Sequence, residues 1–83
     1  MIEEYIKAAM NTAHYEIIED EDPYYGEIAE LKGVWASGKT LEECRDNLHD
    51  NLEGWILIRT SQGLEIPEVN GCKVITPKVL EVA

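Results

Sequence analysis

Residues 40–63 read TLEECRDNLHDNLEGWILIRTSQG, and this stretch decides the fold. Thr40 is followed three residues later by Glu43, the pattern of a capping box. In that motif the hydroxyl accepts a backbone N–H bond and the carboxylate reaches back to the cap. Gly63 follows the last periodic residue and can take the left-handed conformation that ends many helices. The pattern predicts one helix between these two signals, roughly 30 Å long at about 1.5 Å per residue.

Apolar side chains recur along this helix at spacings of three and four, which places them on one face. They are Leu41, Cys44, Leu48, Leu52, Trp55 and Ile56, extended by the aliphatic stem of Arg59. The opposite face is polar, so the helix must lay its apolar face on the rest of the chain. The polar face comprises Glu42, Arg45, Asp46, His49, Asp50, Asn51 and Glu53.

Length and composition indicate a single domain that spans residues 1–83, with one small hydrophobic core. The chain has 83 residues, of which 45% are hydrophobic. Its two cysteines, Cys44 and Cys72, fit neither a disulfide framework nor a metal knuckle, so we expect reduced thiols. No apolar run is long enough to cross a bilayer, and the first residues lack the pattern of a signal peptide. We therefore expect a cytoplasmic protein without a membrane partner.

The charge of the chain is strongly negative and unevenly placed. Seventeen acidic residues against seven basic ones give a formal net charge of -10. Such a field repels nucleic-acid phosphates, so direct nucleic-acid binding is disfavoured. It attracts basic protein surfaces, although acidity is also an ordinary means of staying in solution. No basic residue falls between Lys7 and Lys32, an interval that holds Glu16, Glu19, Asp20, Glu21, Asp22, Glu27 and Glu30.

The residues before the long helix predict a short helix followed by three strands. Helical spacing of Ile2, Tyr5, Ile6, Ala9 and Met10 predicts a helix that ends near Asn11 or Thr12. Alternation from Ala13 onward, with Tyr15 and Ile17 on one side, predicts a first strand. The turn 19–23 then leads to a strand over 24–29, and the turn 30–33 to a strand over 34–37 that Gly38 ends.

Three antiparallel strands followed by an amphipathic helix favour a two-layer α+β fold. The sequence predicts a three- to four-stranded antiparallel sheet packed on one long helix, in the order α-β-β-β-α-β. Pro67 and the pair Asn70-Gly71 are loop and turn signals. Residues 73–76 are expected to add the fourth strand at an edge, where Pro77 stops it.

The segment YYGEIAELKGVWASGKTLEECRDNLHDNLEGWI resembles the HicB-like antitoxin family, the UPF0150-type domain. The resemblance covers Tyr15 to about Pro67. The sequence departs from the family pattern at three positions. Ala29 and Lys32 occupy turn positions where the family usually has proline, and Cys44 occupies a position where it usually has a small residue. The matching residues are Tyr25, Glu27, Ile28, Glu30, Leu31, Gly33, Gly38, Thr40, Leu41, Glu42, Glu43, Leu48 and Leu52.

The resemblance implies a fold, a partner and a mode of action. The fold would resemble part of ribonuclease H, and the partner would be a small basic HicA-type toxin that cleaves mRNA. The antitoxin would inhibit that toxin by covering its active site, without catalysis of its own. Many full-length relatives continue into a domain that binds operator DNA, which these residues do not include. One alternative is an orphan interaction module without a toxin.

No catalytic, metal or cofactor site is predicted from the residues themselves. His14 and His49 lack neighbours at ligand spacing and are expected to be structural or solvated. A degenerate metal-dependent nuclease would need carboxylates gathered around Mg²⁺. Glu16 and Glu27 could be cross-strand neighbours, but no third acid accompanies them. Ser37 and Ser61 lack the flanking pattern of a nucleophile. The sequence also has no glycine-rich phosphate-binding loop.

Aromatic residues supply the candidate contact surface. Trp55 is expected in the core, whereas Trp35 is expected on the sheet face or at an interface. Tyr24 and Tyr25 alternate, so one should face the helix and the other outward beside Trp35. The predicted partner-binding residues are Glu19, Asp20, Glu21, Asp22, Tyr24, Tyr25 and Trp35, and the predicted structural residues are Gly33, Gly38, Thr40, Leu41, Glu43, Leu48, Leu52 and Trp55.

Self-association is also expected. One helix leaves the other sheet face uncovered, with one of Trp35 or Ser37 on it, and the third strand or the tail near Val74 is expected to leave an edge unpaired. Burial of several hundred Å² at about 25 cal/mol per Å² should exceed the screened repulsion between acidic chains. The sequence therefore predicts a homodimer or a higher homo-oligomer.

Overall fold

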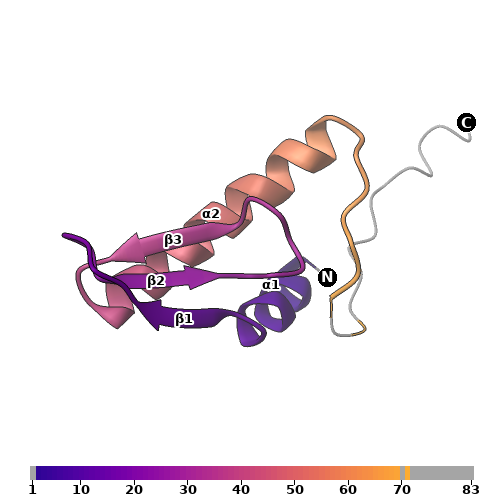
Figure 1. Ribbon diagram of the computed structural model, residues 1–83. Coiled ribbons are helices and arrows are strands. Elements are labelled where there is room, and N and C mark those ends of the chain that lie inside the picture. The colour runs from indigo at the N-terminus through magenta and orange to yellow at the C-terminus, as the bar shows by residue number, and fades with distance from the viewer. Residues whose placement is uncertain (1, 70, 72–83) are drawn as a thin grey trace, which may run out of the picture.

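A computed structural model describes residues 2–69 and 71, and it has the predicted order of elements (Figure 1). Helix α1 spans Ile2–Asn11 and is followed by strands β1, His14–Ile17, β2, Tyr24–Glu27, and β3, Trp35–Gly38. Helix α2 spans Leu41–Ser61. The α+β class and the three-stranded antiparallel sheet are confirmed. The fourth strand predicted at 73–76 lies outside the described residues.

The strands form a meander in the order β1-β2-β3, with α2 running along one face (Figure 1). Tyr15 is opposite Gly26, which is opposite Ala36, and all three face α2. Strands β2 and β3 differ from the predicted bounds by one or two residues. Strand β2 ends at Glu27 because the Val34 N–H donates to the Leu31 carbonyl within the turn, at 3.1 Å, and is not available to pair with Ile28.

The core lies between the sheet and the inner face of α2. That face buries Cys44, Leu48, Leu52 and Ile56, as the spacing predicted. Leu41 was predicted to share it and does not, since its side chain is 48% exposed. It is the first residue of α2 and lies beside the connection 39–40, past the end of β3. The rest of the core comprises Tyr5, Ile6, Ala9, Ile28, Leu31, Val34, Ala36 and Val69.

Both ends of α2 follow the signals in the sequence. The Thr40 hydroxyl accepts the Glu43 N–H at 3.0 Å, which confirms the cap. The Glu43 carboxylate reaches one residue further back than predicted and accepts the Lys39 N–H at 2.7 Å. At the other end Gly63 has a φ of 71°, and the Leu64 N–H donates to the Arg59 carbonyl at 2.8 Å. These bonds satisfy backbone groups that a helix end leaves unpaired.

Residues 64–69 return from the end of α2 toward α1 (Figure 1). The buried Tyr5 of α1 donates its hydroxyl to the Pro67 carbonyl, and Val69 is fully buried. Arg59 donates from Nε to the Glu65 carbonyl at 3.1 Å. This segment thereby joins the two helices and completes the core.

Two glycines allow close packing around the inner side of the sheet. A Cβ at Gly26 would lie 2.7 Å from the Tyr15 ring, and one at Gly38 would lie 2.5 Å from the Cys44 nitrogen. Gly33, in contrast, has open space around it and a φ of 93°, which only glycine adopts readily. The predicted structural roles of Gly33 and Gly38 therefore have different physical causes. Gly26 was not among the predicted structural residues.

Candidate protein-binding face

The side of the sheet away from α2 carries six side chains in two rows across the strands. We call it the outer face. Strand pairing places Glu16 opposite Tyr25 and Tyr25 opposite Ser37, and in the next row His14 opposite Glu27 and Glu27 opposite Trp35. Residues directly opposite each other have Cβ atoms about 4.5–5.5 Å apart. The outer face is thus a small grid of His14, Glu16, Tyr25, Glu27, Trp35 and Ser37.

An aromatic pair occupies the centre of this grid. The rings of Tyr25 and Trp35 stack with centroids 6.1 Å apart and an angle of 29° between their planes. Trp35 is 54% exposed, as expected for a residue on the uncovered face. Trp35 and Ser37 both face outward because they are two positions apart on one strand, which corrects the prediction that only one of them would. Tyr24 faces the α2 side, as the alternation with Tyr25 requires.

Carboxylates flank the aromatic pair. The Tyr25 hydroxyl donates to Glu27 Oε1 at 2.9 Å. This bond, followed by partial burial and the negative charges of Glu27 and Glu16, raises the pKa of Tyr25 above its ordinary value. Tyr25 therefore stays neutral and remains a hydrogen-bond donor at physiological pH. Its bond to Glu27 fixes the orientation of the ring that stacks on Trp35.

The acidic turn predicted to bind a partner lies at the tip of the β1–β2 hairpin. It follows Ile17 and precedes Tyr24, which are opposite each other at the end of the two strands. The turn therefore borders the row that contains Tyr25. Its four acids are exposed or partly exposed: Glu19, Asp20, Glu21 and Asp22.

The free edge of β3 is occupied, contrary to the prediction of an unpaired edge there. Asn51 Nδ2 donates to the Trp35 carbonyl at 2.6 Å, and Asn47 Nδ2 donates to the Ser37 carbonyl at 2.9 Å. These two amides, one helical turn apart on α2, take the carbonyls that point away from β2. A strand from another molecule would have to displace them. Sequence reasoning placed Asn51 on the solvent face and missed this role.

The histidines lie apart from each other. His14 is exposed on the outer face, whereas His49 of α2 pairs with Glu53 at 3.6 Å between Nδ1 and Oε1. Potential ligand atoms of His49, Asp50 and Glu53 lie within 4.8 Å of one another, so His49 does have acids at ligand spacing, contrary to the sequence reasoning. All three belong to consecutive turns of one surface helix. Glu16 and Glu27 occupy different rows and gather no third acid from the described part of the chain.

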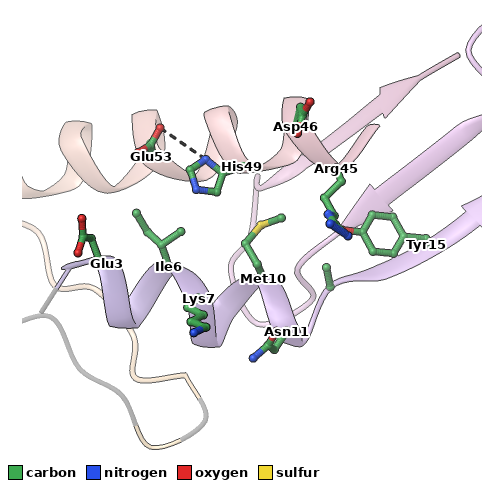
Figure 2. A pocket seen from close by; sticks show the side chains of 11 residues that line it. Glu3, Ile6, Lys7, Met10, Asn11, Tyr15, Arg45, Asp46, His49 and Glu53 are labelled. Carbon is green, nitrogen blue, oxygen red and sulfur yellow. Dashed lines mark ion pairs between the residues drawn. The ribbon is translucent and has the colours of Figure 1, made fainter. Parts of the chain in front are cut away.

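A groove of about 710 Å³ lies between α1 and α2 (Figure 2). Its charges are mixed: α1 contributes Glu3 and Lys7, and α2 contributes Arg45, Asp46 and Glu53. At one end the Tyr15 hydroxyl is buried without a hydrogen-bond partner among the described residues. Burial raises the pKa of Tyr15, while the nearby Arg45 lowers it to a smaller extent. The sequence did not predict this groove, because it depends on how α1 docks against α2.

The two tryptophans have different surroundings. Trp55 is partly buried against the core, as predicted, and the Arg59 guanidinium lies 4.8 Å from the centre of its ring. Trp35 stacks only on Tyr25 within the described chain. Elsewhere on α2, Leu57 and Ile58 are 67% and 59% exposed. Even so, no helix in residues 2–69 is both long and apolar enough to cross a membrane.

Comparisons with known proteins agree with this architecture. The model of the UPF0150-like family matches residues 4–67. The crystal structure of TTHA0281 from Thermus thermophilus is similar, with a TM-score of 0.85 and 46% sequence identity. The alignment covers 88% of this chain and 96% of that one. No match was found among curated proteins.

Proposed function

Because the chain belongs to the UPF0150-like family, we propose that it acts as a HicB-like antitoxin that binds a small basic HicA-type ribonuclease. The composition of the outer face is the main support for this proposal. It combines an exposed aromatic pair with Glu16 and Glu27, and the acidic turn 19–22 lies at its border. Buried aromatic residues with a polar rim are typical of the centres of protein interfaces.

Inhibition follows from charge and position. A ribonuclease that binds RNA presents basic side chains around its active site, since phosphate contacts dominate nucleic-acid affinity. The carboxylates of the outer face and of the acidic turn can occupy those basic positions in place of phosphates. The bound antitoxin then excludes RNA by covering the site. This mechanism requires no catalytic group on the antitoxin.

The same proposal includes a homodimer that leaves the outer face free. With the β3 edge occupied by Asn47 and Asn51, the other edge of the sheet, β1, is the one that no described residue covers. Ile17 is 75% exposed beside this edge. Pairing of β1 with its copy about a two-fold axis would extend the sheet and bury Ile17. The aromatic pair would remain available on each subunit.

Co-expression with the small basic protein encoded by the neighbouring reading frame tests the proposed function. The two proteins should co-purify, and addition of the antitoxin should stop RNA cleavage by the isolated partner. Glu16→Gln combined with Glu27→Gln should weaken both effects. Glu65→Gln combined with Glu68→Gln serves as the control for loss of two exposed carboxylates elsewhere. Absence of a complex and of inhibition would contradict the proposal.

A further inference from the structure

The outer face holds a stacked ring and a carboxylate in the arrangement that suits a guanidinium group. We propose that Trp35 and Glu27 form a binding site for one arginine side chain of the partner protein. This inference rests on the proposed function, because it names the chemical group that the same face recognises. The guanidinium would stack on the exposed Trp35 indole and donate two hydrogen bonds to the Glu27 carboxylate.

The register of the sheet brings the two groups together. Glu27 on β2 is directly opposite Trp35 on β3, so both side chains rise from neighbouring positions on one face. Tyr25 holds each of them, since its ring stacks on Trp35 and its hydroxyl donates to Glu27 Oε1. The site is therefore already arranged before a ligand arrives. Preorganisation of this kind lowers the entropic cost of binding.

Within the described residues, no basic side chain compensates the charge of the site. No Lys or Arg among residues 2–69 forms an ion pair with Glu27 or Glu16, and Tyr25 supplies the hydrogen bond that Glu27 accepts. Glu16 lies across from Tyr25 and adds a second negative charge to the same face. A cation from another molecule would therefore meet two carboxylates beside an aromatic surface. Such a surface attracts cations through the ring quadrupole as well as through charge.

An arginine fits this site better than a lysine does. Its planar guanidinium can stack on an aromatic ring while its N–H groups bind a carboxylate in pairs. A lysine ammonium is compact and strongly hydrated, and it cannot do both in one plane. The chain already contains one such stack, because Arg59 lies 4.8 Å over the Trp55 ring. Trp35 is more exposed than Trp55 and has no arginine of the described chain over its ring, which stacks on Tyr25.

Titration of the full chain with short peptides tests this site directly. The probes are Gly-Arg-Gly-Arg-Gly and the same peptide with lysine or with citrulline, which keeps the shape of arginine without its charge. The readout is the pair of indole N–H signals in a nitrogen-15 NMR spectrum, assigned with Trp35→Phe. The arginine peptide should shift the Trp35 signal saturably and leave Trp55 in place. The lysine peptide should bind roughly fivefold more weakly, and the citrulline peptide should give no saturable shift.

Variants separate the site from general electrostatic attraction. Glu27→Gln should weaken the binding of the arginine peptide by about fivefold, whereas Glu65→Gln should change the affinity of that peptide by less than about twofold. Equal binding of the arginine and lysine peptides, or equal effects of the two substitutions, would overturn the inference. The inference would also be overturned if the Trp35→Leu and Glu27→Gln variants still formed the toxin complex. In that case the antitoxin function would stand without the arginine site. Absence of any toxin complex, with the arginine peptide still bound at Trp35, would reject the antitoxin function alone.

Discussion

The side chain of Asn51 donates a hydrogen bond of 2.6 Å to the main-chain carbonyl of Trp35. This bond ties the last strand of the sheet to α2 at the residue whose indole is presented on the opposite face. Asn47 repeats the contact one helical turn earlier, at the Ser37 carbonyl. The long helix thus covers one face of the sheet and closes the β3 edge as well. Within the described residues, the outer face and the β1 edge are the parts of the sheet that remain uncovered.

Asn51→Ala should lower the free energy of unfolding by about 1 kcal/mol, the typical net value of such a hydrogen bond. The Trp35 carbonyl would lose its partner, and the gain in helix propensity would offset only part of that loss. Asp50→Ala is the matched control, because it brings a similar propensity gain on the solvent side of the same turn. Urea denaturation followed by circular dichroism measures both. Equal stability of the two variants would mean that the edge contact contributes nothing.

Two glycines should respond to alanine in opposite directions. Gly26→Ala would place a methyl group 2.7 Å from the Tyr15 ring and 3.3 Å from Cys44 Sγ, so it should destabilise the fold by about 1–3 kcal/mol. Gly54→Ala in α2 meets nothing within 4 Å and should stabilise it by about 0.5–1 kcal/mol. Thermal unfolding of the two variants provides the comparison. A harmless Gly26→Ala would show that the Tyr15 ring has room to move aside.

The buried hydroxyl of Tyr15 predicts a dependence on alkaline pH. Burial raises its pKa in the folded state above the value of about 10 in the unfolded chain. The corresponding stability is therefore fully present below about pH 10 and is lost as the pH rises through the folded pKa. Tyr15→Phe should make this loss shallower. At neutral pH it should leave stability unchanged or raise it by up to about 1 kcal/mol, because the hydroxyl has no partner.

Denaturant unfolding of both proteins between neutral pH and pH 11 measures this prediction, with that range set by the ordinary tyrosine pKa of about 10. Tyr25→Phe is the contrasting variant, because it removes a hydroxyl that donates to Glu27 at 2.9 Å. It should cost stability at neutral pH where Tyr15→Phe does not. A loss of more than about 1 kcal/mol in Tyr15→Phe would show that its hydroxyl makes a favourable hydrogen bond.

Sedimentation equilibrium tests the proposed dimer. The unchanged chain should be dimeric at micromolar concentration in about 0.15 M salt, where the Debye length is about 8 Å. Ile17→Lys should give a monomer, because it places a charge at the β1 edge. Leu57→Lys is the control, since Leu57 is 67% exposed on α2 and should not affect the dimer. A monomeric unchanged chain would reject self-association, and monomers from both variants would reject the β1 edge as its site.

Local signals predicted those parts of the fold that depend on neighbours in sequence. The cap at Thr40, the closing Gly63 and the buried Leu48 and Leu52 were all predictable, because a helix repeats its contacts every three to four residues. Strand alternation placed one of Trp35 or Ser37 on the uncovered face without deciding which, and the structure places both there. The sequence therefore predicted the long helix, the hairpin and the aromatic residues of the candidate face.

Contacts between distant residues were not predictable in the same way. The roles of Asn47 and Asn51 depend on which carbonyls β3 presents at its free edge, and that depends on the sheet register. The need for glycine at position 26 depends on a ring from β1 and a sulfur from α2. Leu41 fitted the helical spacing but lies past the end of the sheet, which the spacing cannot indicate.

The most direct test of the central claim is the solvent exposure of the Trp35 indole in a complex with the proposed basic ribonuclease partner. A soluble paramagnetic agent should strongly relax the Trp35 N–H signal of the free chain, since this side chain is 54% exposed. In the complex the signal should be protected, while side chains of the α1–α2 groove such as Lys7 should be unaffected (Figure 2). Equal relaxation of Trp35 in the free and bound chain, with protection of the groove instead, would contradict the assignment of the outer face as the binding surface.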